Sequence, residues 1–177
     1  HLSCIIFNLP VQLLKNKHMK KLLLILFIGL STFSNAQNSI QPSFGFNLWN
    51  LAESDMISYM EVGATYEHGL SDQLGINAGA SYNFGENFGE GFFQLSLGGR
   101  YNFNELNDGA FAGAGFGYGF VEGGNFMEFG ANFGYSIPLG PGSLNPNVGL
   151  GYMSVGSDGF RFGGLHIPIN VSYSITF

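Results

Sequence analysis

The sequence predicts an all-β fold: an eight-stranded antiparallel up-and-down transmembrane β-barrel. Three observations predict it. Apolar and polar residues alternate in eight segments, most of them close to the roughly 9–11 residues that a tilted strand needs to cross a bilayer. The 177 residues include 28 Gly and 19 Phe, and the glycines gather on the polar side of the alternation. No segment after Gln37 has a convincing helical period, so no helix is expected to cover the apolar faces.

Residues before the barrel are expected to serve export. In residues 19–36, two lysines precede a short apolar run, and small residues stand three and one positions before a cleavage site between Ala36 and Gln37. This pattern is typical of a secretory signal peptide, because the apolar run is too short to span a bilayer. Residues 1–18 look unrelated to it and are interpreted as an upstream extension of the reading frame. The barrel domain is therefore predicted at 37–177.

The charge of this domain excludes nucleic acid as a partner. All four lysines precede it, which leaves Arg100 and Arg161 against 12 acidic residues and a formal net charge of −10. Two basic residues cannot neutralise a phosphate backbone. The single cysteine, Cys4, also precedes the domain, so no disulfide is needed in an oxidising compartment.

The alternation locates the strands in chain order. In residues 73–85 the even positions are Leu, Ile, Ala and aromatic residues, whereas the odd positions are Gln, Gly, Asn and Ser. Side chains alternate across a strand, so each segment has one apolar and one polar face. The fifth segment has glycines from Gly113 to Gly119 on its polar face, an arrangement that leaves room for water. The predicted strands are residues 43–49, 58–69, 73–85, 92–103, 110–121, 126–137, 147–155 and 161–177.

The composition of the two faces indicates which medium each one meets. A soluble barrel would carry charges outside and apolar side chains inside, and a lipocalin-like barrel with an apolar pocket is the alternative fold. Here the polar face is mostly Gly, Ser and Asn, and Tyr and Phe often stand near strand ends, where membrane barrels place interfacial girdles. Closing the sheet pairs every backbone polar group, as lipid requires. We expect the apolar face to meet lipid and the polar face to line the interior.

The last strand carries a more specific signal. It reads NVSYSITF and places Val171, Tyr173, Ile175 and Phe177 on one face. With the signal peptide and the eight strands, residues 41–177 resemble small bacterial outer-membrane β-barrels of the OmpA/OmpX type. The resemblance implies a Gram-negative cell outer membrane, contact with its lipid and lipopolysaccharide, and handling by periplasmic chaperones and the barrel assembly machinery. It also implies that Tyr173, Ile175 and Phe177 form the C-terminal assembly signal.

An even number of strands predicts that both chain ends lie on the periplasmic side. All connections are short, although such barrels usually have longer outer loops. Pro168, inside the last strand, removes one ladder donor, so a bulge is expected there. The loop acids Glu53, Asp55, Glu86, Glu90, Glu122 and Asp158 are interpreted as a solvated rim, because no spacing resembles a calcium loop. The predicted outward loops are residues 50–57, 86–91, 122–125 and 156–160, and the periplasmic turns are 70–72, 104–109 and 138–146.

Charged residues expected inside the barrel are the candidate functional group. Arg100 is the only basic residue predicted to face inward, with Glu67 near it at the periplasmic end. Glu61, Glu128 and His166 are predicted in the outer half. Because an eight-stranded barrel is just wide enough to be filled by its side chains, we favour a structural network that plugs the lumen. The alternative is a narrow polar or cation-favouring pore lined by the same residues.

No catalytic site, metal site or cofactor is expected. His68 is predicted on the outer face beside Tyr66, and neither it nor His166 has a Ser and a carboxylate placed as nucleophile and orienting group. Metal-ligand spacing is absent, and GFGYGF at 115–120 lies within a strand pattern, where it cannot cradle phosphate. The predicted function is a structural or cell-surface role without catalysis. A pore is the first alternative, and an adhesin or receptor, disfavoured by the short loops, is the second.

Overall fold

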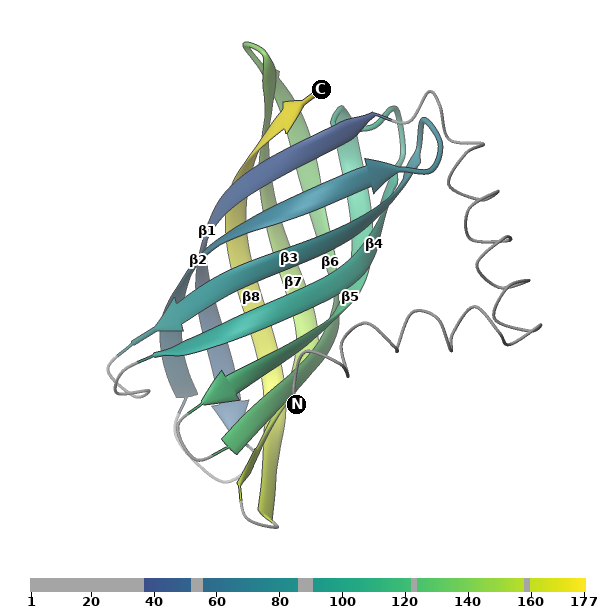
Figure 1. Cartoon of the computed structure of the whole chain (residues 1–177). Helices are drawn as coiled ribbons and strands as arrows, with labels where there is room; N and C mark the ends of the chain where they lie inside the picture. The colour runs from purple at the N-terminus through teal and green to yellow at the C-terminus, as the bar shows by residue number, and fades with distance from the viewer. Residues whose placement is uncertain (1–36, 52–55, 86–90, 122–123, 158–159) are drawn as a thin grey trace, which may run out of the picture. The chain divides into compact units, whose positions relative to one another are not determined.

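The computed structural model of the chain describes residues 37–51, 56–85, 91–121, 124–157 and 160–177. Over these ranges each strand pairs with the next in an antiparallel sheet, and the last strand pairs with the first, which closes the barrel (Figure 1). No helix in the described ranges is long and apolar enough to cross a membrane. The strands are β1 (Asn38–Leu51), β2 (Met56–Gly69), β3 (Leu74–Phe84), β4 (Phe92–Asn102), β5 (Gly109–Val121), β6 (Gly124–Leu139), β7 (Gly142–Ser157) and β8 (Phe160–Thr176).

Closure joins the two ends of the barrel domain. Asn38 N donates to Phe177 O at 3.3 Å, and Phe177 N donates to Asn38 O at 2.9 Å. We call the end of the barrel that holds these residues the terminus end and the opposite end the loop end. The two ends of the barrel domain therefore lie at the same end of the barrel, as an even number of strands requires, and the periplasmic side stays a prediction.

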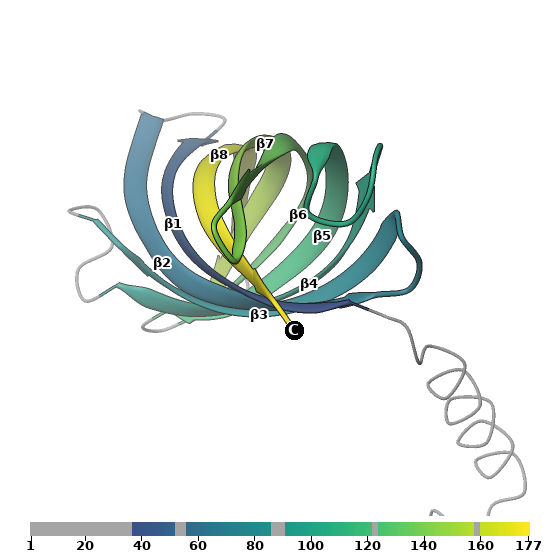
Figure 2. The same ribbon diagram turned by 90° about the horizontal axis from the view of Figure 1, so that it is seen from above.

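Strand pairing also fixes the width of the barrel. Following paired residues from Gln41 through all eight strands leads back to β1 at Leu51, a stagger of ten residues. A staggered barrel must tilt its strands (Figures 1 and 2), and with eight strands its interior is just wide enough for side chains to fill it. The contacts between inward side chains therefore decide what the lumen can do.

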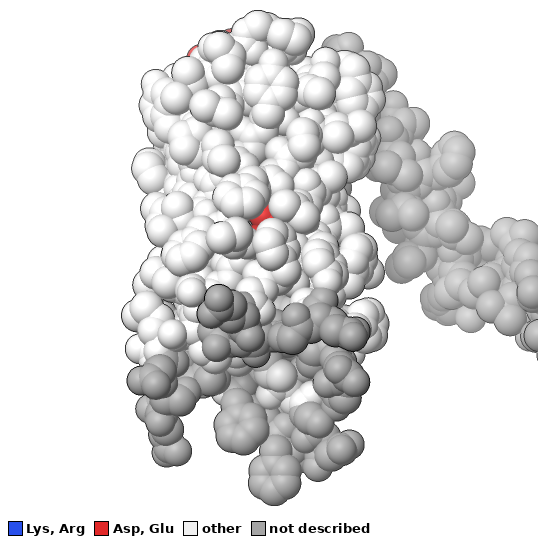
Figure 3. Space-filling model, turned by 90° about the vertical axis from the view of Figure 1, so that its left-hand side faces the viewer, with Lys and Arg blue, Asp and Glu red and all other residues white. Residues whose placement is uncertain are grey.

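The two faces of the sheet have the predicted polarity. Outward side chains are large and apolar, for example Leu97 at 65% and Phe129 at 59% exposure, whereas Asn47, Asn83 and Asn102 are fully buried. This is the reverse of a soluble protein and of the lipocalin-like alternative. The side of the outer wall seen in Figure 3 is almost free of charged side chains, apart from small red patches. Such a wall suits lipid.

The connection between β6 and β7 corrects the predicted turn at 138–146. β6 continues to Leu139 and β7 begins at Gly142, so only Gly140 and Pro141 connect them. Gly140 has a φ of 62°, the left-handed conformation that glycine adopts readily in a tight hairpin. Prolines and glycines suggested a longer turn, but the flanking prolines of this segment lie within the strands. β1 also begins before its predicted start.

Prolines inside strands interrupt the ladder without shifting its register. Paired positions are skipped beside Pro42, Pro146 and Pro168, and the same register continues on both sides of each gap. The bulge expected at Pro168 is therefore wrong. Proline has no N–H to donate, so it fits where a ladder bond is missing. Because the register is unchanged along each described ladder, inward positions stay inward over the whole strand.

Several predicted features lie outside the described residues. They are the signal peptide at 19–36 with Ala36, the upstream extension at 1–18, the side chain of Arg161, and the parts of the outward loops at 52–55, 86–90, 122–123 and 158–159, which contain all of the loop acids named above.

Candidate functional site in the barrel lumen

Arg100 forms the centre of a buried polar cluster near the terminus end. Its side chain is 6% exposed and that of Glu67 is 1% exposed, and Arg100 Nη1 lies 3.6 Å from Glu67 Oε2. Arg100 Nε donates to Asn102 Oδ1 at 3.0 Å, and Nη2 donates to Ser136 Oγ at 2.5 Å. The guanidinium carbon lies 3.8 Å from the centre of the Phe111 ring, a cation–π contact. We call these five residues the arginine cluster.

Further polar side chains connect the arginine cluster to other walls of the barrel. Gln41 Nε2 donates to Glu67 Oε2 at 2.8 Å, and Ser136 Oγ donates to Asn145 Oδ1 at 2.6 Å. These residues come from β1, β2, β6 and β7. A buried charge is tolerated when it is paired and hydrogen-bonded, and this arrangement supplies partners for both the guanidinium and the carboxylate.

Aromatic side chains fill the lumen near the loop end. Trp49, Tyr59, Phe92, Phe126 and Met153 form one buried cluster, each at most 3% exposed, which we call the aromatic plug. The Phe92 and Phe126 rings meet edge to face with centroids 4.6 Å apart, and Tyr59 and Phe92 are 5.7 Å apart. These positions share the inward parity of their predicted strands, although the expected inward group contained only charged residues and His166.

His166 links the aromatic plug to the interior carboxylates. His166 Nε2 lies 2.9 Å from the Tyr59 hydroxyl and 3.1 Å from Asn47 Oδ1. On the other side of the ring, Nδ1 lies 2.8 Å from Glu128 Oε1, and Glu128 Oε2 accepts a bond from Gln94 Nε2 at 2.9 Å. A side chain from β8 is thereby held between residues of β1, β2 and β6.

Most inward glycines of β5 leave space that side chains of the neighbouring strands occupy. A Cβ at Gly119 would overlap the Phe126 ring, and one at Gly117 would overlap the amide of Gln94. A Cβ at Gly113 would likewise meet the amide of Asn132. Side chains of neighbouring strands therefore lie directly over these three glycines, although Gly113 and Gly117 also line the cavity described below.

Gly115 of β5 has only backbone atoms of the neighbouring strand close to it, and it belongs to a larger group of adjacent glycines. Gly98, Gly115, Gly130 and Gly151 are paired in succession across β4 to β7. All four line an internal cavity. A Cβ at Gly115 would lie 3.0 Å from the backbone oxygen of Leu97, so the strands here leave no room for a side chain. The cavity wall at this level is bare backbone.

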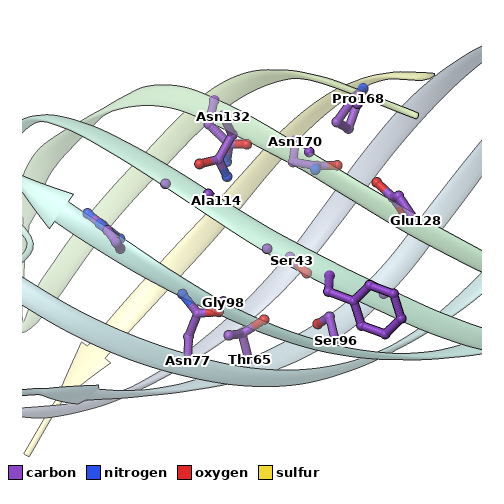
Figure 4. A pocket seen from close by; sticks show the side chains of 18 of the residues that line it. Ser43, Thr65, Asn77, Ser96, Gly98, Ala114, Glu128, Asn132, Pro168 and Asn170 are labelled. Carbon is purple, nitrogen blue, oxygen red and sulfur yellow. The ribbon is translucent and has the colours of Figure 1, made fainter. Parts of the chain in front are cut away.

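The cavity has a volume of about 240 Å³ and a mainly polar lining. Members of the arginine cluster line it, and so do Glu61, Glu128 and His166, so it lies between the arginine cluster and the aromatic plug. Asparagine, serine and threonine side chains surround the space between them (Figure 4). The lumen thus contains a polar cavity with the arginine cluster on one side and the aromatic plug on the other.

The structure places the five predicted lumen residues on the inner wall, four of them in two separate pairs. Arg100 lies with Glu67, whereas His166 lies with Glu128. Glu61 lines the same cavity and accepts a bond from Asn47 Nδ2 at 3.4 Å.

Outward residues singled out from the sequence lie near the terminus end. Ile175 is 45% and Phe177 is 68% exposed, and the Tyr173 hydroxyl donates to the Leu139 carbonyl at 2.8 Å. His68 Nδ1 lies 2.7 Å from Asn38 Oδ1, to which the Tyr66 hydroxyl also donates, at 2.9 Å.

No group of acidic, histidine or cysteine side chains within the described ranges is placed to hold a metal ion. The nearest approach to a catalytic arrangement is the series Tyr59, His166 and Glu128, because it has the order of nucleophile, base and orienting carboxylate. Tyr59 is 3% exposed and belongs to the aromatic plug, so its hydroxyl faces protein rather than substrate.

No protein-family model matches the chain, and no curated protein matches its sequence. Among solved structures, Neisserial surface protein A (NspA) is similar, with a TM-score of 0.57 and 10% identity over 79% of this chain and 97% of that chain. The N-terminal β-barrel domain of Pseudomonas aeruginosa OprF has a TM-score of 0.46 and 11% identity over 78% and 97% of the two chains. Ail, the attachment invasion locus protein of Yersinia pestis, has a TM-score of 0.45 and 10% identity over 79% and 99%. The chain therefore has the closed eight-stranded fold of small outer-membrane β-barrels, as the sequence resemblance implied.

Proposed function

We propose that the protein is an integral barrel of a Gram-negative outer membrane, with a sealed lumen and a structural or cell-surface role without catalysis. The apolar outer wall supports membrane insertion, because its large exposed side chains would be costly in water. The signal peptide proposed at 19–36, cut between Ala36 and Gln37, would direct export.

Closure of the lumen on both sides of the cavity carries this proposal. At the loop end the aromatic plug leaves Phe126 and Met153 at 1% and 0% exposure. At the terminus end Arg100 is hydrogen-bonded to residues of β4 and β6 and stacked on Phe111. A hydrated ion would have to displace one of these groups, so the geometry favours a stable wall over a conduit.

Biogenesis and lipid contact supply the proposed partners. The outward positions of Ile175 and Phe177 near the terminus end leave them accessible, with Tyr173, to a barrel assembly machinery that reads the last strand. Periplasmic chaperones would hold the apolar strands before insertion, and lipid and lipopolysaccharide would cover the outer wall afterwards.

Planar-bilayer conductance tests the sealed lumen. The protein is folded in detergent, its folding is verified by the shift of an unboiled sample on a gel, and it is then inserted into the bilayer. We expect no steady channel steps, because both closures remain in place. Steady steps from the wild-type barrel would contradict the proposal.

A narrow cation-favouring pore is the second candidate, and the polar cavity is the observation that favours it. Three carboxylates, those of Glu61, Glu67 and Glu128, line this space with Arg100 and His166. A pore of this kind would give channel steps whose reversal potential in a salt gradient favours cations. A Phe126→Ala barrel separates the two candidates. In a pore, loss of the ring should enlarge the steps, whereas in a sealed barrel the arginine cluster still closes the terminus end and no steps should appear.

A further inference from the structure

The turn between β4 and β5 crosses the mouth of the lumen at the terminus end. Residues 103–108 form this turn, and on each side two further strands separate it from the seam where β8 pairs with β1. Two of its side chains are nevertheless buried: Leu106 is 7% and Asn107 is 8% exposed. A side chain of a short turn becomes buried only by packing on another element. The elements that it contacts lie on the opposite wall of the barrel.

The two buried side chains of the turn reach both sides of the seam. Asn107 Nδ2 donates to Thr176 Oγ1 of β8 at 3.4 Å. Leu106 Cδ2 lies over Gly69 at the end of β2, where an added Cβ would be 3.4 Å away from it. Gly69 N donates to Gln37 O, immediately before β1, at 2.9 Å. By strand parity Gly69 and Thr176 face the lumen, so the turn lies across the inside of the mouth.

The backbone of the turn has the shape that this contact requires. Asn107 has a φ of 63°, the left-handed conformation that asparagine tolerates better than most residues. Gly109 follows with a φ of 73°, and Asp108 N donates to Glu105 O at 3.1 Å. The residue with the uncommon backbone conformation is therefore the one whose side chain contacts β8.

The seam is interrupted close to the place that the turn reaches. The ladder between β1 and β8 skips two residues of β1, one of which, Pro42, has no N–H to donate. On the terminus side of this gap Ser39 and Ile40 pair with β8, and Asn38 exchanges two backbone bonds with Phe177. A short ladder at a chain end opens more easily than a long one. A contact from another wall therefore has its greatest effect here.

We propose that the β4–β5 turn is a latch that holds the terminus end of the β1–β8 seam closed. Leu106 lies over the joint between β1 and β2, and Asn107 binds β8, so the two contacts lie on both sides of the seam. Pairing of β8 with β1 brings these two surfaces together, so the latch engages at the last step of barrel closure. This role is independent of whether the lumen conducts.

Hydrogen exchange of single backbone amides, followed by NMR on the folded full chain in detergent, measures opening of the seam. Asn107→Gly removes the side chain and keeps the left-handed backbone, which glycine adopts readily. The Phe177 amide, which donates to Asn38 O, should then exchange roughly 2- to 12-fold faster, the factor that corresponds to the loss of one hydrogen bond. Leu106→Ala should also accelerate it, and provides a second variant in case Asn107→Gly does not fold.

The matched control is Glu105→Ala, which truncates an exposed side chain of the same turn. It should leave exchange at the seam unchanged. The β6–β7 ladder at the same end, where Ile137 pairs with Leu144, is the internal reference and should keep its exchange rate in every variant.

A cross-link tests the contact itself. Asn107→Cys and Thr176→Cys are combined with Cys4→Ser, so that no other thiol is present. The folded protein is treated with dibromobimane, which becomes fluorescent after it has joined two thiols. We expect this pair to be cross-linked and the linked barrel to show slower exchange at the seam. The control pair, Glu105→Cys with Thr176→Cys, should be linked much less.

Three outcomes would overturn the proposal. Equal exchange of the Phe177 amide in Asn107→Gly, Leu106→Ala and Glu105→Ala would mean that the turn does not hold the seam. Equal acceleration at the seam and in the β6–β7 ladder would mean that the turn supports the whole end of the barrel. Equal cross-linking of the two cysteine pairs would mean that the turn is not seated on β8.

Discussion

The two ends of the lumen are filled by side chains of opposite chemistry. The aromatic plug at the loop end consists of rings and a methionine in van der Waals contact. The arginine cluster at the terminus end consists of one guanidinium, one carboxylate and the groups that hydrogen-bond to them. When a buried ring is truncated, the loss of folding stability grows with the volume of the cavity left behind. When a buried ion pair loses one partner, the other partner remains as an uncompensated charge. The charged closure should therefore be the more sensitive to single substitutions.

Both closures nevertheless depend on glycines in the facing strand. Gly119 leaves the space that the Phe126 ring occupies, and Gly134 leaves the space for the Phe111 ring. Gly75 does the same for Glu67, since a Cβ there would lie 2.7 Å from Glu67 Oε1. Inward glycines in this barrel thus leave room for a side chain of the neighbouring strand, and we call such a position a socket. What differs between the two ends is the side chain seated in the socket.

Arg100→Ala should have the largest effect. It leaves the carboxylate of Glu67 buried and without its cation, and it removes the contact with Phe111. Breaking a buried pair in this way costs about 3–5 kcal/mol. The measurement is the unfolding free energy from urea titration of the gel shift.

Neutralising both partners at once provides the control for this prediction. The double variant Arg100→Met with Glu67→Gln keeps similar volumes and removes both charges, so most of the lost stability should return. If the double variant is as unstable as Arg100→Ala, packing against Phe111 rather than charge pairing stabilises the terminus end.

Gly119→Ala should have an intermediate effect at the loop end. The new methyl group would overlap the Phe126 ring and force it out of its socket, and overpacking of this kind costs about 1–3 kcal/mol. Gly99→Ala is the matched control, because a Cβ there meets only the Gly75 oxygen at 3.7 Å. The same titration should show little change for the control. Equal stability of the two variants would contradict the assignment of Gly119 as a socket.

The sequence was sufficient to predict the fold because the alternation of side chains is a local property of a strand. It placed Leu97 outside and Asn83 inside, as observed. The prediction failed at the β6–β7 hairpin, because proline has two roles. It is common in turns, and it also fits within a strand at a position that donates no hydrogen bond to the neighbouring strand. The two roles of Pro146 differ only in the pairing of its neighbours, which the local sequence does not contain.

The candidate site was predictable in part for the same reason. Parity and position along the strands predict which charged residues face inward and at which end. Sockets such as Gly119 depend on register, because the ring seated there comes from the neighbouring strand, and an isolated Gly-rich segment gives no sign of its partner. The aromatic plug was within reach of sequence reasoning, since Tyr59, Phe92 and Phe126 all fall on inward positions near the loop end.

Tyr59→Phe should have the smallest effect of the three. The substitution keeps the ring in the aromatic plug and removes the hydroxyl that lies 2.9 Å from His166 Nε2. That nitrogen still lies 3.1 Å from Asn47 Oδ1, and the other contact of the hydroxyl is a long bond to Met153 Sδ at 3.6 Å, so the loss should be about 0.5–1.5 kcal/mol. Tyr66→Phe is the control, because its hydroxyl is on the exposed outer wall and should contribute less. If Tyr59→Phe destabilises the barrel as much as Arg100→Ala, then the link to His166, rather than ring packing, closes the loop end, and both ends would rely on polar contacts.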